Sequence, residues 1–237
     1  MMIGSLPSGK GSTMRLLDDE TLEHSAVVAN RTMNRERGLT GSGGYGRALG
    51  LDVLDVLRSR PSTRPVVRWL DLCCGEARAL LEASEALGDD AEIVGVDLVD
   101  FFAGPSRPPR LRLITASITT WEPDEQFDLI TCVHGLHYVG DKLGVLSRIP
   151  AWLTDGGMFV GDFDPGCVRL EDGSPAGRRL AAALRASGFA YDSRRHRITC
   201  GSGGGGGLPY RYLGSDAAAG PNYTGQPAVD SYYSFTG

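Results

Sequence analysis

The segment 66–77 constrains the fold of this chain more than any other stretch. An apolar run at 66–72 predicts a buried strand that carries a carboxylate, Asp71, close to its end. Small residues follow at 73–75, and a helical pattern then covers 77–87. Small residues let the backbone approach a ligand closely, and a helix N-terminus presents free N–H groups with a partial positive charge. The segment therefore predicts a strand–turn–helix unit with a nucleotide-type site at its turn.

A second apolar run ends in an acid about twenty residues later. It covers 91–97 and finishes at Asp97. In a doubly wound sheet, an acid at the tip of the second strand accepts hydrogen bonds from ribose hydroxyls. Asp97 would equally suit the cap of a helix or turn. Two acid-bearing strands at this spacing favour the nucleoside site.

Strands and helices alternate along the middle of the chain, which predicts an α/β fold with a parallel sheet covered by helices on both faces. The expected strands are 66–72, 92–97, 111–115, 127–133 and 157–163, and the expected helices are 77–87, 141–153 and 175–187. The link at 101–109 holds three prolines, so we expect no long helix between the second and third strands. Two further strands are expected at 195–200 and 208–213, joined by the glycine-rich loop 201–207 into an antiparallel hairpin at the sheet edge.

This α/β core is expected at 61–215, and the segments on either side of it differ from it in composition. Residues 1–14 are rich in Gly, Ser and Lys and are expected to be disordered. Residues 15–60 predict a helical segment, with helices at 15–34 and 45–58, that serves as a lid. Residues 216–237 are rich in Gly, Pro and Tyr and predict an irregular segment laid over the core.

Composition excludes several classes of function. The 237 residues carry 24 Lys and Arg against 29 Asp and Glu, a formal net charge of −5 that argues against a nucleic-acid partner. The basic run 194–197 is interpreted as a solvated face. Five cysteines without zinc-ligand spacing suggest reduced thiols in a cytoplasmic protein and no metal site. Neither a signal-peptide core nor a membrane-length apolar stretch is present, so no membrane association is expected.

The motifs at 71–77 and 94–97 resemble those of the class I S-adenosylmethionine-dependent methyltransferase superfamily, and the likeness extends from about 66 to 163. Cys73 and Ala77 stand where glycine is common in the first motif. The turn and strand at 153–160 are similar to the family's fifth strand. The resemblance implies a Rossmann-like, doubly wound, mostly parallel seven-stranded sheet with a C-terminal antiparallel hairpin. It also implies S-adenosyl-L-methionine as cofactor and S-adenosyl-L-homocysteine as product.

The resemblance also suggests which residues meet the cofactor. Ser117 stands where the family often has an acid for the adenine amine, so the contact would fall to Ser117 and the backbone around Ile118. At 43–47, Tyr45 and Arg47 fit a lid that closes on the amino-acid end, although an ordinary helix start explains them equally well. The expected cofactor-binding residues are Tyr45, Arg47, Asp71, Cys73, Gly75, Asp97, Leu98, Ser117, Ile118 and Cys132.

Candidates for the chemistry follow the fourth strand. Methyl transfer from a sulfonium is an in-line displacement, and a general base is needed only when the nucleophile must lose a proton. His134 and His137 are the candidate bases, and either would equally serve to line or pack the pocket. Tyr138, Asn222 and Tyr223 are candidate substrate-binding residues. The last two belong to a polar-aromatic run that equally suits a docked tail or a homodimer contact.

The sequence therefore predicts a methyltransferase that acts on a small molecule at O, N or C, as a monomer or homodimer. The lack of an Asn/Asp-Pro-Pro-aromatic motif removes the adenine and glutamine acceptors of some family members. A nicotinamide-dependent oxidoreductase is the alternative enzyme, although 73–78 departs from its Gly-x-Gly-x-x-Gly fingerprint. A non-catalytic module that binds the cofactor is the third possibility.

Overall fold

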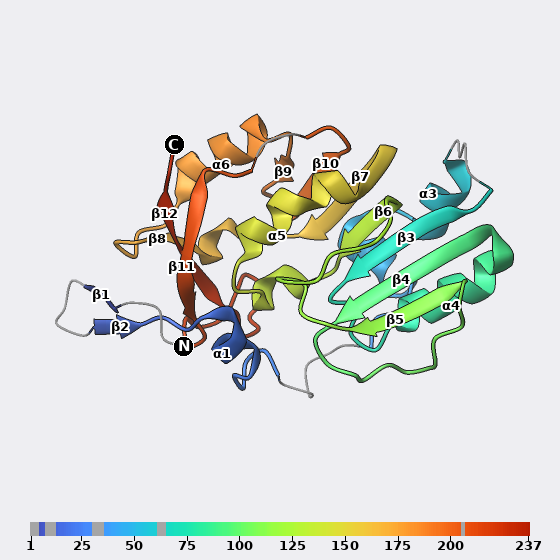
Figure 1. Cartoon of the computed structure of the whole chain (residues 1–237), viewed down its shortest axis with the longest axis horizontal. Helices are drawn as coiled ribbons and strands as arrows, with labels where there is room; N and C mark the ends of the chain where they lie inside the picture. Colours follow the sequence, from blue (N-terminus) through green and yellow to red (C-terminus); the bar gives the residue numbers. More distant parts are fainter. Residues whose placement is uncertain (1–4, 8–12, 30–35, 61–64, 205–206) are drawn as a thin grey trace.

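A seven-stranded sheet forms the centre of the computed structural model, which describes residues 5–7, 13–29, 36–60, 65–204 and 207–237 (Figure 1). Its strand order is β5-β4-β3-β6-β7-β10-β9. The first five strands in this order are mutually parallel, and β10 runs antiparallel to both of its neighbours. They are β5 (Leu111–Thr115), β4 (Ala91–Asp97), β3 (Val67–Leu72), β6 (Phe127–Cys132) and β7 (Leu153–Asp162). The predicted fold class is confirmed.

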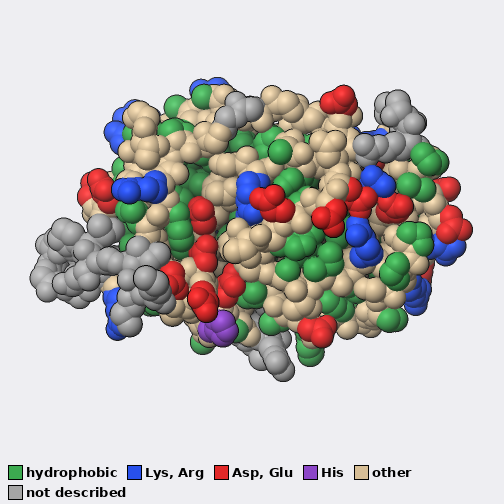
Figure 2. All heavy atoms as spheres, in the orientation of Figure 1, with side chains coloured by type: hydrophobic (Ala, Val, Ile, Leu, Met, Phe, Trp, Pro, Cys, Tyr) green, Lys and Arg blue, Asp and Glu red, His purple; other side chains and the backbone are tan. Residues whose placement is uncertain are grey.

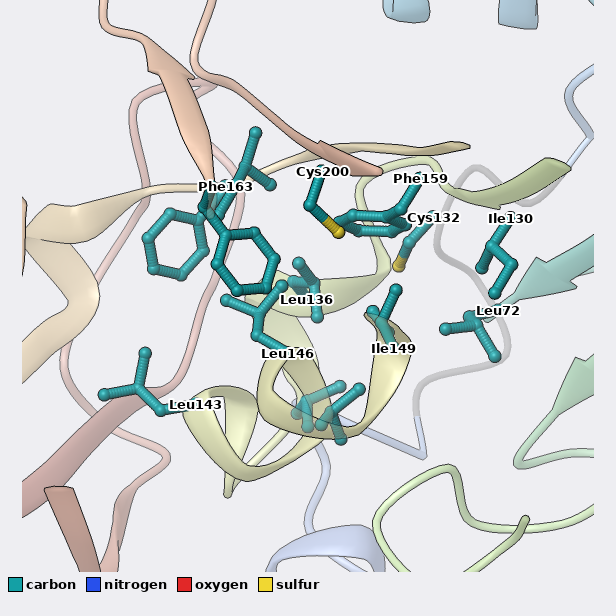
Figure 3. Close-up of a cluster of buried hydrophobic side chains, with 14 of the residues drawn as sticks. Leu72, Ile130, Cys132, Leu136, Leu143, Leu146, Ile149, Phe159, Phe163 and Cys200 are labelled. Carbon is teal, nitrogen blue, oxygen red and sulfur yellow. The ribbon is translucent and has the colours of Figure 1, made fainter. Parts of the chain in front are cut away.

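The two faces of this sheet carry separate apolar clusters, as the two-residue period of a strand requires. Trp69 packs in one cluster and its neighbour Leu70 in the other. Trp69 shares its cluster with α2 (Tyr45–Leu49), α3 (Val53–Ser59) and α4 (Arg78–Leu87). The second cluster buries side chains of α5 (Lys142–Arg148) and α6 (Gly177–Ala186). Figure 3 shows part of it, with Leu136, Leu146 and Phe163 gathered together.

The crossover from β4 to β5 has no helix in its described residues, as its prolines predict. The predicted helix 141–153 is shorter in the structure, because α5 ends at Arg148 and a 3-10 turn, η3 (Ile149–Trp152), follows. Pro150 lies in that turn and cannot donate a backbone hydrogen bond to continue the α-helix.

The C-terminal hairpin is built from different strands than the sequence predicts. β10 (Arg197–Gly201) pairs with β9 (Ala190–Asp192), not with the predicted strand 208–213. β11 (Tyr210–Asp216) belongs to a second, three-stranded sheet with β12 (Asp230–Phe235) and β8 (Val168–Leu170), which Figure 1 shows beside the main sheet. A three-residue strand gives little periodic signal, and the glycine-rich loop is long enough to carry the chain to another sheet.

The prediction that 216–237 is irregular is wrong for β12. Ser231 and Tyr233 are fully buried there, and the strand pairs with β11 on one side and with β8 on the other. Hydroxyl-bearing residues occupy most of this strand, so its sequence lacks the apolar pattern of a core strand. Tyr233 finds a partner for its hydroxyl at the backbone N–H of Leu143, 3.1 Å away, which allows a phenol to be buried.

The N-terminal segment is less helical than predicted. Of 15–34 only α1 (Asp19–Glu23) is helical among the described residues, and 30–35 lie outside them. The predicted helix 45–58 is split into α2 and α3, because Gly50 adopts a left-handed φ of 64° between them. Within the segment expected to be disordered, β1 (Ser5–Pro7) pairs with β2 (Thr13–Arg15), and 1–4 and 8–12 lie outside the described residues.

Two properties of the described residues bear on partners. None of their helices combines the length and the apolar character that a membrane span requires. Figure 2 shows acidic and basic side chains interspersed over one face, without an extended patch of Lys and Arg among its described atoms.

Candidate functional site

A pocket lies at the carboxyl ends of the parallel strands, where ligands bind in sheets of this kind. It gathers seven of the predicted cofactor-binding residues and two of the other candidates, His134 and Tyr138. The seven are Tyr45, Cys73, Gly75, Asp97, Leu98, Ser117 and Ile118. The remaining lining residues are Glu23, Val28, Arg37, Cys74, Ala116, Thr119, Val133, Gly135, Val139, Gly140 and Gln226.

Asp97 is held in place by the turn that follows β3. The backbone N–H of Gly75 donates to one carboxylate oxygen of Asp97 at 2.8 Å, and that of Val99 donates to the other at 3.2 Å. Gly75 has a left-handed φ of 59°, which glycine adopts without a steric penalty. The carboxylate is therefore oriented by two strand tips at once and is presented to the pocket.

Gly135 allows the turn after β3 to meet the end of β6. A Cβ at this position would lie 2.3 Å from the Cβ of Cys73, so only glycine fits. Against the prediction that Cys132 contacts the cofactor, the structure buries this side chain completely and leaves it out of the pocket lining. Figure 3 shows Cys132 beside Phe159 and Cys200 in the core.

Asp71 lies beneath the pocket and not in its lining. Its carboxylate accepts hydrogen bonds from the Tyr45 hydroxyl at 2.6 Å and from the Thr131 hydroxyl, which in turn accepts from the Trp69 indole at 2.8 Å. Burial raises the pKa of Asp71 to about 7, and the nearby charge of Asp97 contributes in the same direction. The structure thus gives Asp71 a positioning contact with Tyr45, in place of the predicted direct contact with the cofactor.

Arg47 also falls outside the pocket. Its side chain is exposed and donates to the carbonyl of Ser42 at 3.3 Å. Tyr45 and Arg47 both lie on α2, and residues two apart on a helix point about 200° away from each other, so both cannot face the pocket. Arg37 lines the pocket instead and donates to the carbonyl of Gly43 at 3.1 Å.

His134 faces the pocket with a carboxylate behind it. Its backbone N–H donates to Asp162 at 3.1 Å, and its ring Nδ1 lies 3.7 Å from the same oxygen. Burial, aided by the charge of Arg37, lowers the pKa of His134 to about 4. Burial raises the pKa of Asp162 to about 6. At pH 7 the imidazole is therefore neutral and lies beside an ionised carboxylate.

His137 does not line the pocket, against the prediction that it is a base. It lies in η2 (Gly135–Tyr138), is 2% exposed, and packs edge-on against Tyr223 at a ring separation of 5.4 Å. Its Nε2 has no hydrogen-bond partner among the described residues, and burial lowers its pKa to about 3. The rings of His134 and His137 lie 6.0 Å apart, but of the two only His134 lines the pocket.

The predicted substrate residues Asn222 and Tyr223 also lie away from the pocket lining. Asn222 is buried and accepts hydrogen bonds from the backbone N–H and the hydroxyl of Thr224, which fixes a turn. Tyr223 stacks on His196 with ring centroids 3.7 Å apart. The same loop does reach the pocket through Gln226, whose side chain accepts from the Tyr138 hydroxyl at 3.3 Å.

Sequence reasoning missed the lining residues from the two ends of the chain. Glu23 and Val28 come from the segment that begins with α1, and Gln226 comes from the loop before β12. An apolar cluster of Leu22, Val28 and Val229 joins these segments, and Leu98 and Tyr138 pack against it. The sequence shows apolar residues in this segment, such as Leu22 and Val28, but nothing in it says what covers them.

A nucleoside-type pocket at the strand tips of a seven-stranded sheet with one antiparallel strand defines a class I methyltransferase fold. A family model described as a methyltransferase domain matches residues 44–170, slightly more than half of the chain. The chain therefore belongs to this methyltransferase family, and the resemblance drawn from its motifs is confirmed.

Curated relatives match part of the chain. The demethylmenaquinone methyltransferase of Lysinibacillus sphaericus (strain C3-41) is 31% identical over 105 residues, which cover 42% of this chain and 45% of the relative. The 2-phytyl-1,4-naphtoquinone methyltransferase of Synechococcus elongatus is 26% identical over 104 residues, or 40% of this chain and 45% of the relative. The chain thus spans less than half the length of these two proteins.

Among solved structures, an amino pentose methyltransferase from Micromonospora echinaspora is similar to the chain. It is 25% identical, with a TM-score of 0.38, and the match covers 47% of this chain and 48% of that one.

Proposed function

We propose that this protein transfers the methyl group of S-adenosyl-L-methionine to a small molecule and releases S-adenosyl-L-homocysteine. The observation that carries the proposal is the Asp97 carboxylate, which the Gly75 N–H orients at the strand tips. An acid in this position accepts hydrogen bonds from the two ribose hydroxyls of a nucleoside. The oxidoreductase alternative lacks its glycine fingerprint at 73–78.

The pocket lining supports a consistent orientation for the cofactor. With ribose at Asp97, the base would extend toward Ser117 and Ile118 at the end of β5. The amino-acid end would lie toward Arg37, whose guanidinium pairs well with a carboxylate. Tyr45, which Asp71 holds through its hydroxyl, would close the same end. When bound, the cofactor supplies an electrophilic methyl group on a sulfonium.

His134 is the proposed general base for acceptors that must lose a proton. Among the described residues it is the histidine that lines the pocket, and it is neutral near pH 7 because its pKa is lowered to about 4. Asp162, 3.7 Å from Nδ1, would stabilise the imidazolium that forms. A base matters less for an acceptor that is already ionised, and then His134 would position it.

The acceptor is proposed to be a small, largely apolar compound with an oxygen or nitrogen near the methyl group. Val28, Leu98 and Val139 supply apolar lining, while Tyr138 and Gln226 supply a polar pair. The two relatives described above are named for quinone compounds, which fit this description. A cytoplasmic location and a monomeric or homodimeric state stay predictions.

Calorimetric titration tests the cofactor assignment. We expect S-adenosyl-L-homocysteine to bind with one site per chain and NADH to show no heat of binding. Binding of NADH alone would end the methyltransferase proposal. Transfer of labelled methyl from S-adenosyl-L-methionine to a panel of quinols, phenols and amines then tests catalysis, and binding without transfer to any of them favours the non-catalytic module.

A further inference from the structure

A carboxylate from the N-terminal segment reaches the base side of the pocket. Glu23, the last residue of α1, lines the pocket and accepts a hydrogen bond from the hydroxyl of Ser117. The two residues are 94 positions apart in the chain. The Ser117 oxygen lies 2.7 Å from the hydroxyl of Thr119, so a small network fixes the carboxylate.

The register of the sheet places this carboxylate beside the position of the base. Asp97 at the end of β4 is opposite Thr115 at the end of β5. Ser117 follows Thr115 by two residues and lines the pocket together with Ile118. A nucleoside whose ribose is held by Asp97 would therefore extend its base over the end of β5, toward Ser117 and Glu23.

An ionised carboxylate only accepts hydrogen bonds. It therefore attracts an exocyclic amino group and repels a carbonyl oxygen. One of the Glu23 oxygens accepts from the Ser117 hydroxyl, which orients the group, and the other oxygen has no hydrogen-bond partner among the described residues.

We propose that Glu23 determines nucleobase specificity by accepting a hydrogen bond from the 6-amino group of adenine. The proposal rests on the proposed cofactor. It assigns base recognition to α1 and not to the tip of a core strand, where Ser117 alone has no negative charge. The base is then recognised only when α1 is docked, since Leu22 and Val28 pack this segment against Val229.

The test compares two ligands that differ only at position 6 of the purine. S-adenosyl-L-homocysteine carries an amino group there, and S-inosyl-L-homocysteine carries a carbonyl oxygen. We expect the wild-type protein to bind the amino compound at least ~30-fold more tightly, because the carbonyl oxygen cannot donate to the half-buried carboxylate of Glu23 and is repelled by it. Calorimetry gives both dissociation constants without any methyl acceptor.

Glu23→Gln should reduce this ratio to about threefold or less, since an amide both donates and accepts. Ser117→Ala should reduce it to an intermediate value, because the carboxylate remains but loses its orienting hydroxyl. Glu20→Gln, an exposed change on the same helix, is the matched control and should keep the wild-type ratio.

Three outcomes would overturn the proposal. A wild-type protein that binds both compounds equally has no 6-amino recognition. If a folded Glu23→Gln protein keeps the wild-type ratio of the two dissociation constants, another residue recognises the 6-amino group. If Glu23→Gln fails to fold, the same conclusion follows from a Ser117→Ala protein that keeps the wild-type ratio. Failure of the wild-type protein to bind either compound overturns the proposed cofactor together with this inference.

Discussion

The two walls of the pocket are built in different ways. The inner wall consists of strand tips, where Gly75 and Asp97 are fixed by hydrogen bonds between neighbouring strands. The outer wall consists of α1 and the loop before β12, which the small apolar cluster around Leu22 and Val229 holds in place. The inner wall is therefore rigid and suited to positioning reacting groups, and the outer wall is suited to opening for ligands and to selecting among them.

The largest effect is expected at the inner wall, from His134→Gln. If His134 is the base, the turnover rate should fall ~100-fold or more, while the affinity for S-adenosyl-L-homocysteine changes little. His24→Gln, an exposed change on the outer wall, is the matched control and should leave both unchanged. Steady-state kinetics with the best acceptor of the panel measure the effect, and an unaltered rate removes His134 from the chemistry.

The same site should give the rate a defined dependence on pH. The pKa of His134 is lowered to about 4 and that of Asp162 is raised to about 6, both by burial. The active form, a neutral imidazole beside an ionised carboxylate, therefore accumulates as the pH rises through about 6. We expect the rate to rise between pH 5 and about 7 and then to level off, and this rise to be lost in His134→Gln.

Asp97→Ala should weaken S-adenosyl-L-homocysteine binding by ~50-fold, because it removes two ribose hydrogen bonds and frees the Gly75 N–H. Asp100→Ala, an exposed change in the loop that follows β4, should leave affinity within a factor of two. Calorimetry measures both. Equal affinities for these two variants would contradict the assignment of Asp97 to the ribose.

Asp71→Asn tests whether Asp71, which lies beneath the inner wall, makes the free energy of unfolding depend on pH. The pKa of Asp71 in the folded protein is about 7, above the ordinary 3.8. Protonation of Asp71 therefore stabilises the folded state fully below about pH 4, and this stabilisation is lost as the pH rises to about 7. Between pH 5 and 8 the wild-type protein should lose on the order of 2 kcal/mol from this group. Urea unfolding should show a smaller loss in Asp71→Asn, and parallel pH curves for the two proteins would refute the raised pKa.

The smallest effect is expected from Arg37→Gln. Loss of a partly exposed guanidinium should weaken S-adenosyl-L-homocysteine binding about tenfold. Binding of 5′-methylthioadenosine, which lacks the amino-acid end, should not change. Arg47→Gln is the control, because the structure places Arg47 outside the pocket. Equal losses for both ligands would show that Arg37 acts on the fold and not on the carboxylate.

The inner wall could be predicted from the sequence because local rules determine it. Asp97 is the last residue of β4 and Gly75 lies in the turn after β3, and parallel strands bring their carboxyl ends to one edge. A local rule also explains why Arg47 lies outside the pocket, because it is two residues from Tyr45 on α2 and therefore points away from it. The outer wall could not be predicted, because tertiary contacts bring Glu23, Arg37 and Gln226 to the pocket. Such contacts produce no periodic pattern in the sequence.

The C-terminal strands show the same limit. β12 pairs with β8, about sixty residues earlier in the chain, and its buried side chains include Ser231 and Tyr233. Such a strand is stabilised by specific hydrogen bonds, such as that between Tyr233 and Leu143, and not by an apolar pattern. Its position also explains how the loop before it brings Gln226 to the pocket.

A crystal structure of the protein with S-adenosyl-L-homocysteine is the most direct test of the site. The account predicts ribose hydroxyls on Asp97, the base between Ile118 and Glu23, the carboxylate near Arg37, and the sulfur directed toward His134. A ligand bound elsewhere, or one whose sulfur points away from His134 with its ribose off Asp97, would contradict it.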